Sequence, residues 1–221
     1  MKKDYIIAVD GPSGAGKSTV SQMLAERLGY LYLDTGAMYR AAALKALRMG
    51  LDLDDPESVR KVTDQLEIEL GKDGKKAIVM LNGEDVTTAI REPDMGMAAS
   101  KISRHQVIRE KLWEIQRKLG RKGKVVAEGR DVGTMVFPHA DFKFFVTAGA
   151  EERADRRFKE LTAKGFKVNR KEILADVQKR DEQDSGRKLA PLKPAADAIM
   201  IDTTELNAEQ AVEKILSYIG H

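Results

Sequence analysis

Short apolar runs alternate with segments of helical periodicity along this 221-residue chain. Each run lacks polar alternation and is rich in β-branched or aromatic residues, which is typical of strands buried on both faces of a sheet. The runs occupy residues 5–9, 30–33, 124–127, 142–147 and 198–201. After the first run, Val20, Leu24 and Leu28 recur at helical spacing. This alternation predicts a five-stranded parallel sheet flanked by helices, an α/β fold.

One segment departs from the alternation. Between residues 66 and 86 the apolar residues recur at about every second position, the period of an antiparallel strand. Within it, the pair Asn82-Gly83 favours a tight hairpin turn. Pro56, which follows two aspartates, predicts the start of a helix that leads into the segment. We therefore expect a small antiparallel insertion in the main fold.

Composition restricts the classes of function. Lysine and arginine total 38 against 35 aspartate and glutamate residues, a net charge of +3 that does not indicate a nucleic-acid partner. The chain has no cysteine, which excludes disulfides and thiolate metal sites and fits a reducing cytosol. Its apolar runs are far shorter than the roughly 18 residues that span a bilayer, and residues 1–14 do not resemble a signal peptide. We expect a cytoplasmic protein that binds neither membranes nor nucleic acid.

A glycine-rich stretch follows the first apolar run. Residues 11–18 read GPSGAGKS and match the phosphate-binding pattern GxxxxGKS/T between a strand and a helix, the context that this motif requires. In such a loop, backbone N–H groups point at phosphate oxygens. We expect Lys17 to reach the outer phosphates of a nucleoside triphosphate and Ser18 to ligate Mg²⁺. The expected triphosphate-binding residues are Gly11, Pro12, Ser13, Gly14, Ala15, Gly16, Lys17, Ser18 and Thr19.

The glycine loop alone does not identify the reaction, because GTPases, motor ATPases and small-molecule kinases share it. A GTPase would ordinarily carry a guanine-reading NKxD motif, and the nearest stretch, residues 169–172, reads NRKE. Three later blocks are more specific: DTGAMYR at 34–40, EGRDVGT at 128–134 and RDEQDSGR at 180–187. The first two follow predicted strands, where a parallel sheet binds its ligands.

Together with the glycine loop, these blocks closely resemble the bacterial cytidylate kinases of the nucleoside monophosphate kinase group. The resemblance covers essentially the whole chain, including the antiparallel segment. It implies transfer of the γ-phosphoryl group of ATP, bound with Mg²⁺, to CMP or dCMP, giving ADP and CDP or dCDP. It also implies one P-loop kinase domain over residues 1–221, with an NMP-side antiparallel insertion at about 62–93 and a helical lid at about 150–170.

Arginines in and near the matched blocks supply guanidinium groups suited to phosphate. Phosphoryl transfer depends on positioning and on positive charge around the transferred group. The resemblance places Arg153 to Arg157 on the lid over ATP. Adjacent residues on a helix face different ways, whereas residues four positions apart share a face. We therefore favour Arg153 and Arg157, which are four apart, over Arg156. The expected catalytic residues are Lys17, Arg130, Arg153, Arg157 and Arg187.

Recognition of cytosine needs a carboxylate opposite its N4 amino group and donors opposite N3 and O2. By similarity to the family, Asp131 reads the amino group, and Arg109 with Ser100 reads the acceptors. Asp131 has an alternative role as the ion-pair partner of a neighbouring arginine. Uracil would place a carbonyl against Asp131, a mismatch of about 1–3 kcal/mol, so we expect CMP to be preferred over UMP. The expected CMP-binding residues are Thr35, Tyr39, Arg40, Ser100, Arg109, Arg130, Asp131, Arg180, Asp184 and Arg187, with Asp184 and Arg180 at the pentose.

Two positions depart from the commoner family pattern. Residues 34–36 read DTG where DSG is common, and residues 128–131 read EGRD where DGRD is common. Glu128 ends a predicted strand and resembles the Walker B acid that organises Mg²⁺ through water, with one extra methylene. Ser18 and Glu128 are therefore the expected metal-associated residues, and the histidines show no ligand spacing.

Two other functions stay open. Another small P-loop kinase, acting on a different nucleoside monophosphate or on shikimate, would share the glycine loop, although the set of Asp131, Arg109 and Ser100 argues against it. A protein that uses ATP for conformational control would give ADP and free phosphate, or nothing. We expect a monomer with small-molecule substrates. The sequence leaves open the preference between CMP and dCMP, the amplitude of lid closure and the role of the insertion.

Overall fold

The computed structural model describes residues 4–73 and 76–220. The chain divides into two compact units. Unit 1 comprises Met1–Tyr32 and Gly123–His221, and unit 2 comprises Leu33–Lys122. Each unit has its own cluster of buried apolar side chains. No helix in the described part of the chain is long and apolar enough to cross a membrane.

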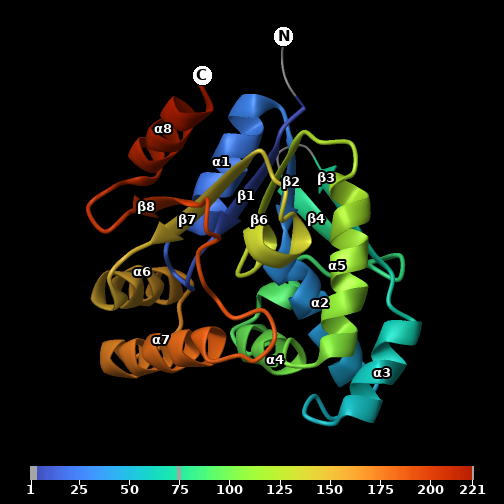
Figure 1. Cartoon of the computed structure of the whole chain (residues 1–221). Coiled ribbons are helices and arrows are strands. Elements are labelled where there is room, and N and C mark those ends of the chain that lie inside the picture. Colours follow the sequence, from blue (N-terminus) through green and yellow to red (C-terminus); the bar gives the residue numbers. More distant parts are fainter. Residues whose placement is uncertain (1–3, 74–75, 221) are drawn as a thin grey trace. The chain divides into compact units, whose positions relative to one another are not determined.

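A five-stranded parallel sheet organises the fold, with every strand but one wholly inside unit 1. Its strands are β1 (Ile6–Asp10), β2 (Leu31–Asp34), β6 (Val125–Gly129), β7 (Phe142–Thr147) and β8 (Ile199–Asp202). They lie in the order β2-β6-β1-β7-β8, and β2 carries the division between the units (Figure 1). Because β1 lies at the centre, its last residue Asp10 has Gly129 of β6 as a neighbour on one side and Phe145 of β7 on the other. The predicted α/β fold with a parallel sheet is confirmed.

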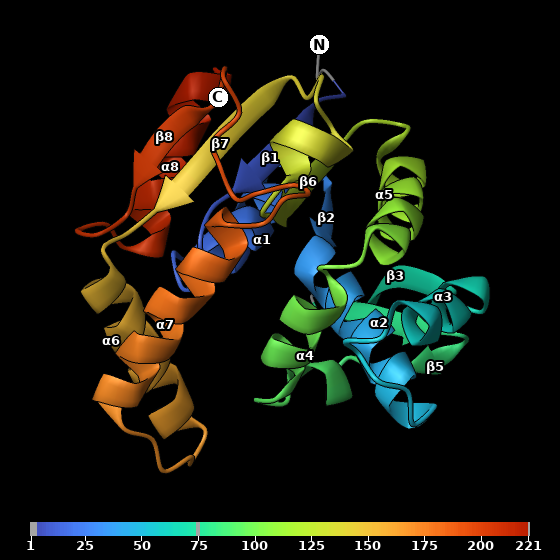
Figure 2. The same cartoon turned by 60° about the horizontal axis from the view of Figure 1, so that its bottom comes forward.

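Helices α1 (Lys17–Leu28) and α8 (Ala208–Ile219) pack with the sheet in the core of unit 1. Helix α1 ends at Gly29, whose φ of 68° suits glycine, and α8 starts from a capping box between Asn207 and Gln210. Helices α6 (Ala150–Ala163) and α7 (Arg170–Ser185) lie side by side around a separate small cluster, as Figure 2 shows. These two helices include the segment for which the sequence predicts a helical lid.

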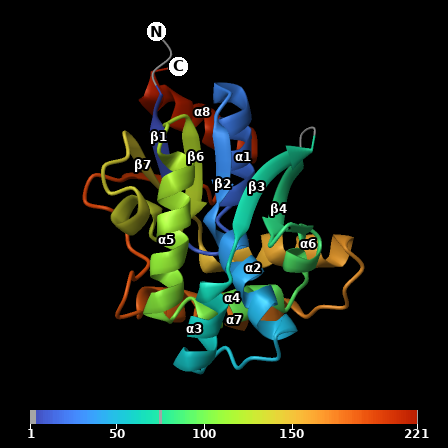
Figure 3. The ribbon, with the colours of Figure 1, turned by 90° about the vertical axis from the view of Figure 1, so that its right-hand side faces the viewer.

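Unit 2 combines helices with an antiparallel sheet of three strands in the order β3-β4-β5. Figure 3 shows β3 and β4 side by side. Asn82 and Gly83 both have positive φ, 49° and 81°, between β4 and β5, which confirms the predicted tight turn. Helix α3 begins at Pro56, as predicted, and the Asp55 carboxylate accepts the N–H groups of its first turn. The elements are α2 (Thr35–Arg48), α3 (Pro56–Asp64), β3 (Ile68–Asp73), β4 (Lys76–Leu81), β5 (Glu84–Asp85), η1 (Ala89–Arg91), α4 (Met95–Ile102) and α5 (Gln106–Gly120).

Candidate active site

The glycine loop joins the end of β1 to the start of α1. Gly11 has φ of 148°, and a Cβ atom at this position would lie 1.9 Å from the Val146 carbonyl oxygen, so no larger residue fits. Gly16, with φ of 85°, is the residue from which α1 starts. The loop therefore follows a path in which backbone N–H groups and a helix N-terminus are available to an anion.

Lys17 lies folded back into this loop. Its side chain is buried, and Nζ donates to the Pro12 carbonyl oxygen at 2.6 Å. Burial, helped by the nearby charge of Arg130, lowers the pKa of Lys17 from 10.5 to about 7, although Glu128 and Asp10 act in the opposite direction. An arriving phosphate would offer this amine an anionic partner and favour its charged form.

Glu128 lies one residue before the end of β6, and its side chain is 4 % exposed. The Tyr32 hydroxyl, from β2, donates a hydrogen bond to Oε1 of Glu128. This contact holds the longer carboxylate in one position. The sequence reasoning did not identify Tyr32, because its place in an apolar run gives no sign of what its hydroxyl contacts.

Asp184, near the end of α7, binds two arginines: Arg130, which lies 54 positions earlier, and Arg187, which lies just past the end of the helix. Its Oδ2 accepts from Arg130 Nε at 2.8 Å, and its Oδ1 accepts from Arg187 Nη2 at 2.5 Å. Burial alone would raise the pKa of Asp184, but the charges of Arg130, Arg187 and Arg180 outweigh it and lower that pKa. We call Arg130, Asp184 and Arg187 the Asp184 cluster. It holds two guanidinium groups in fixed positions on a carboxylate that is only 2 % exposed.

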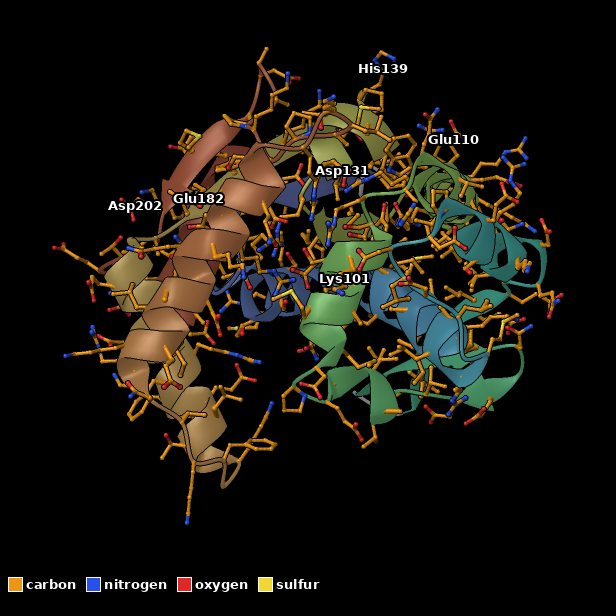
Figure 4. The ribbon with its side chains drawn as sticks, turned by 90° about the horizontal axis from the view of Figure 1, so that it is seen from below. Lys101, Glu110, Asp131, His139, Glu182 and Asp202 are labelled. Atoms are coloured by element: carbon orange, nitrogen blue, oxygen red, sulfur yellow. The ribbon has the colours of Figure 1, made fainter. Side chains whose placement is uncertain are left out.

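Asp131 follows Arg130 and immediately precedes the short helical segment η2 (Val132–Val136); Figure 4 labels its side chain. It is buried. The next two backbone N–H groups, of Val132 and Gly133, donate to the two carboxylate oxygens of Asp10 at 2.8 and 2.7 Å. Asp10 is a second functional candidate that the sequence reasoning missed, because its partners lie 122 and 123 positions away.

Arg153 of α6 contacts the glycine loop directly. Its side chain is buried, and its Nη1 donates to the Ser13 carbonyl oxygen at 3.1 Å and to Asp181 Oδ1 at 3.0 Å. Its Nε donates to the Ala148 carbonyl oxygen at 2.9 Å. Arg153, a residue of α6, therefore forms hydrogen bonds both to the glycine loop and to α7.

The next two arginines of α6 point to different partners. Arg157, favoured from the sequence, donates to Glu160 on its own helix at 2.8 Å, and its side chain is 40 % exposed. Arg156, which we did not favour, donates through Nη2 to the Thr203 carbonyl oxygen at 2.6 Å. The Thr203 hydroxyl donates to the Ala15 carbonyl oxygen of the glycine loop at 3.0 Å. Arg156 thus reaches the loop through one intermediate residue.

In unit 2 the predicted acceptor residues come from three helices. Thr35, Tyr39 and Arg40 lie on α2, Ser100 on α4 and Arg109 on α5. The Arg109 guanidinium carbon lies 5.5 Å from the centre of the Tyr39 ring, within cation–π range, and Arg109 is 1 % exposed.

Asp34 organises the start of α2. Its Oδ1 accepts from the Ala37 N–H at 2.7 Å, and its Oδ2 accepts from Arg40 Nη2 at 3.0 Å. Thr35 and Ser100 are both buried. The structure therefore brings Tyr39 against Arg109 and Arg40 against Asp34. Ser103 links Ser100 to Arg109, because its hydroxyl donates to the Ser100 carbonyl oxygen at 2.9 Å and its carbonyl oxygen accepts from Arg109 Nε at 2.6 Å.

Solved structures of similar fold include P-loop enzymes. A crystal structure of shikimate kinase from Bacteroides thetaiotaomicron is 12% identical, with a TM-score of 0.51 over 98% of this chain and 99% of that one. An uncharacterised protein from Eubacterium ventriosum is 16% identical, with a TM-score of 0.54 over 99% of each chain. At this identity the two structures support the fold alone.

Sequence comparison is more specific. The family model described as cytidylate kinase matches residues 7–221. A protein named cytidylate kinase from Citrifermentans bemidjiense is 50% identical over 214 residues, 97% of this chain and 92% of its own length. Another of that name, from Syntrophotalea carbinolica, is 48% identical over 221 residues, 100% of this chain and 94% of its own. This chain therefore belongs to the cytidylate kinase family.

Proposed function

We propose that this protein transfers the γ-phosphoryl group of ATP to CMP or dCMP, giving ADP and CDP or dCDP. The observation that carries the proposal is the match of nearly the whole chain, at about half of its positions, to proteins named cytidylate kinase. The local structure supports it, because the glycine loop offers a site for triphosphate and the Asp184 cluster offers a second group of cations.

ATP is assigned to the glycine loop. The loop residues 11–19 bind its phosphates, largely through backbone N–H groups, and Lys17 follows the γ-phosphoryl group as it moves. Arg153 and Arg157 are proposed to stabilise charge on that group, and the contact of Arg153 with Ser13 supports a role next to the loop. The amine of Lys17 already lies folded into the loop, where an arriving phosphate would replace the Pro12 carbonyl oxygen as its partner.

CMP is assigned residue by residue from the family resemblance. Its phosphate is bound by arginines, its base by one carboxylate and two donors, and its pentose by Asp184 with Arg180. The phosphate ligands are Arg40, Arg130 and Arg187, the base is read by Asp131, Ser100 and Arg109, and Thr35 and Tyr39 line the pocket. The attacking phosphate oxygen is already an anion, so the reaction needs positioning and positive charge rather than a general base.

Mg²⁺ is the metal that these residues suit. Ser18 and Glu128 supply hard oxygen donors, and Tyr32 fixes the Glu128 carboxylate. Within residues 4–73 and 76–220, no three acidic or histidine side chains are grouped so as to hold a metal. Mg²⁺ in kinase sites is commonly held by one or two protein oxygens together with substrate phosphates and water. When bound, Mg²⁺ would neutralise charge on the phosphates of ATP.

Steady-state kinetics with ATP and each of CMP, dCMP, UMP and AMP tests the proposal. We expect kcat/KM to be highest for CMP or dCMP, with UMP lower by about tenfold or more. Equal values for CMP and UMP would remove Asp131 as the reader of the amino group, and activity on AMP alone would assign a different acceptor. We also propose that the enzyme works as a monomer in the cytoplasm, a reducing compartment that its cysteine-free composition fits.

A further inference from the structure

Asp10 is a buried carboxylate to which the proposed reaction assigns no role. It is the last residue of β1, directly before the glycine loop, and is 4 % exposed. Burying a carboxylate is unfavourable unless its charge is satisfied by hydrogen bonds. Here each oxygen accepts one backbone N–H group, from Val132 at 2.8 Å and from Gly133 at 2.7 Å.

Asp10 contacts the backbone immediately before and immediately after two residues, Arg130 and Asp131. On one side of them, Gly129 is the neighbour of Asp10 across the parallel ladder between β1 and β6. On the other side, the N–H groups of Val132 and Gly133 bind the Asp10 carboxylate. A single residue therefore fixes the backbone both before and after this pair.

Gly133 leaves little room for a side chain between its backbone and the Asp10 carboxylate. A Cβ atom on Gly133 would lie 3.3 Å from Asp10 Oδ2 and 3.3 Å from Lys143 Cδ. Lys143 is itself held, because its Nζ donates to the Pro138 carbonyl oxygen at 2.6 Å and to Asp197 at 2.9 Å. A methyl group at position 133 would therefore press on the Asp10 carboxylate on one side and on the held Lys143 side chain on the other.

The charges around Asp10 are compatible with this role at neutral pH. Burial raises the pKa of Asp10 from 3.8 to about 6, and the charge of Asp131 acts in the same direction. The N–H groups of Gly133 and Val132 and the charge of Lys17 oppose that increase. At pH 7 the group is therefore mainly ionised, and both oxygens are available as acceptors.

We propose that Asp10 is a positioning residue for acceptor recognition, holding Arg130 and Asp131 in a fixed relation to the glycine loop. The inference rests on the proposed function. Asp131 is the proposed reader of the cytosine amino group and Arg130 a proposed phosphate ligand, so Asp10 acts on substrate choice without contacting substrate. Substitution of a residue that is needed only for folding would lower kcat/KM for all nucleotide substrates by the same factor.

The test compares Asp10→Asn with wild type for kcat/KM on CMP and on UMP. Asparagine has the size of aspartate but keeps one acceptor oxygen and places an NH₂ group opposite an N–H group. We expect kcat/KM for CMP to fall by about 10- to 100-fold, and the ratio of kcat/KM for CMP over UMP to fall by about tenfold. The dissociation constant of ATP, measured by calorimetry, should change by less than about threefold.

A matched control is Asp141→Asn. Asp141 also accepts an N–H group of β1, from Ile6 at 2.8 Å, but it is exposed and lies outside the matched blocks. We expect the control to leave the CMP to UMP ratio unchanged. If Asp10→Asn does not fold, Gly133→Ala, which presses on the same carboxylate, should show the same loss of discrimination.

The inference is overturned if the ratio of kcat/KM for CMP over UMP is unchanged in Asp10→Asn, even if overall activity falls. Where Asp10→Asn is unfolded, the same ratio in Gly133→Ala decides. Wild-type protein in the same assay separates this from failure of the proposed function. If wild type does not phosphorylate CMP, the proposed function fails and the inference fails with it. If wild type prefers CMP and the variant keeps that preference, only the inference fails.

Discussion

The glycine loop and the Asp184 cluster present positive charge in two different ways. In the loop, residues that are consecutive in the sequence offer backbone N–H groups and the buried amine of Lys17. In the Asp184 cluster, a buried carboxylate holds Arg130, which is 54 positions away, and Arg187, which lies three positions away beyond the end of α7. The loop depends on local backbone geometry, whereas the cluster depends on the tertiary fold.

This difference has a functional consequence. The partial positive charge of backbone N–H groups cannot be removed by changing a side chain. Substitutions should therefore weaken phosphate binding by the glycine loop mainly at its lysine and its glycines. In the Asp184 cluster both guanidinium groups bind the same carboxylate, so a change at Asp184 disturbs both. Variants of the two regions should therefore separate effects on ATP from effects on CMP.

Lys17→Ala should have the largest effect. Removing a preorganised cation that follows the γ-phosphoryl group should lower kcat by about 10²- to 10³-fold, with an additional loss of ATP affinity. Lys214→Ala, an exposed lysine of α8, is the control and should be neutral. Stopped-flow or coupled-assay kinetics measures both. If the Lys17 variant loses ATP affinity but keeps kcat, the lysine binds the ground state only.

Asp184→Asn should have the next largest effect, and this effect should fall on CMP rather than on ATP. We expect kcat/KM for CMP to fall by about 10- to 100-fold while KM for ATP stays within about threefold, because both arginines lose their anionic partner. Breaking this buried ion pair should also lower the free energy of unfolding by about 3 kcal/mol. Asp155→Asn, which removes an exposed carboxylate paired with Arg170, serves as the control. An equal increase of both KM values would show that the two regions are not separate.

The same variant makes a prediction about pH. Because the pKa of Asp184 is lowered from its ordinary value of 3.8, its ionised form stabilises the folded state above that pH. That stabilisation is lost as the pH falls through the lower pKa of the folded protein. The difference in unfolding free energy between wild type and Asp184→Asn should therefore be full at pH 5–7 and shrink below pH 3.8. Urea unfolding at a series of pH values measures it, and a difference that grows toward low pH would contradict the assignment.

The comparison also explains what the sequence can predict. The strands, the glycine loop and the turn at Asn82-Gly83 are local patterns, and the structure confirms them. The partners of Asp10 and of Tyr32 lie 122 and 96 positions away, so only the order of strands in the sheet brings them together. The helix spacing rule separated Arg156 from Arg157 but did not show which of them would face the loop.

Glu128→Gln should have a smaller effect, confined to turnover. We expect kcat to fall by about tenfold with KM for CMP nearly unchanged, since the amide is a poorer partner for Mg²⁺ and its waters. Tyr32→Phe, which leaves the carboxylate but removes the hydroxyl that fixes it, should lower kcat by about threefold. Measuring the ATP–Mg²⁺ affinity by calorimetry gives a second readout. Normal turnover in Glu128→Gln would remove this residue from the mechanism.

Arg157→Ala should have the smallest effect. Its guanidinium is exposed and bound to Glu160 on the same helix, so its loss should leave thermal stability unchanged. We expect kcat to fall by about threefold to tenfold if the arginine exchanges Glu160 for phosphate during turnover. Lys164→Ala, which removes the other cation paired with Glu160, is the matched control. An unchanged kcat would remove Arg157 from the proposed catalytic residues.

The ratio of CDP formed to ADP formed, with ATP and CMP as the only nucleotides supplied, tests the central claim most directly. Chromatographic separation of the nucleotides over a time course gives both amounts. If the glycine loop supplies the phosphoryl group and CMP receives it, one CDP should form for each ADP, with no free phosphate. ADP that accumulates with free phosphate and without CDP would contradict the account and indicate a protein that hydrolyses ATP for conformational control.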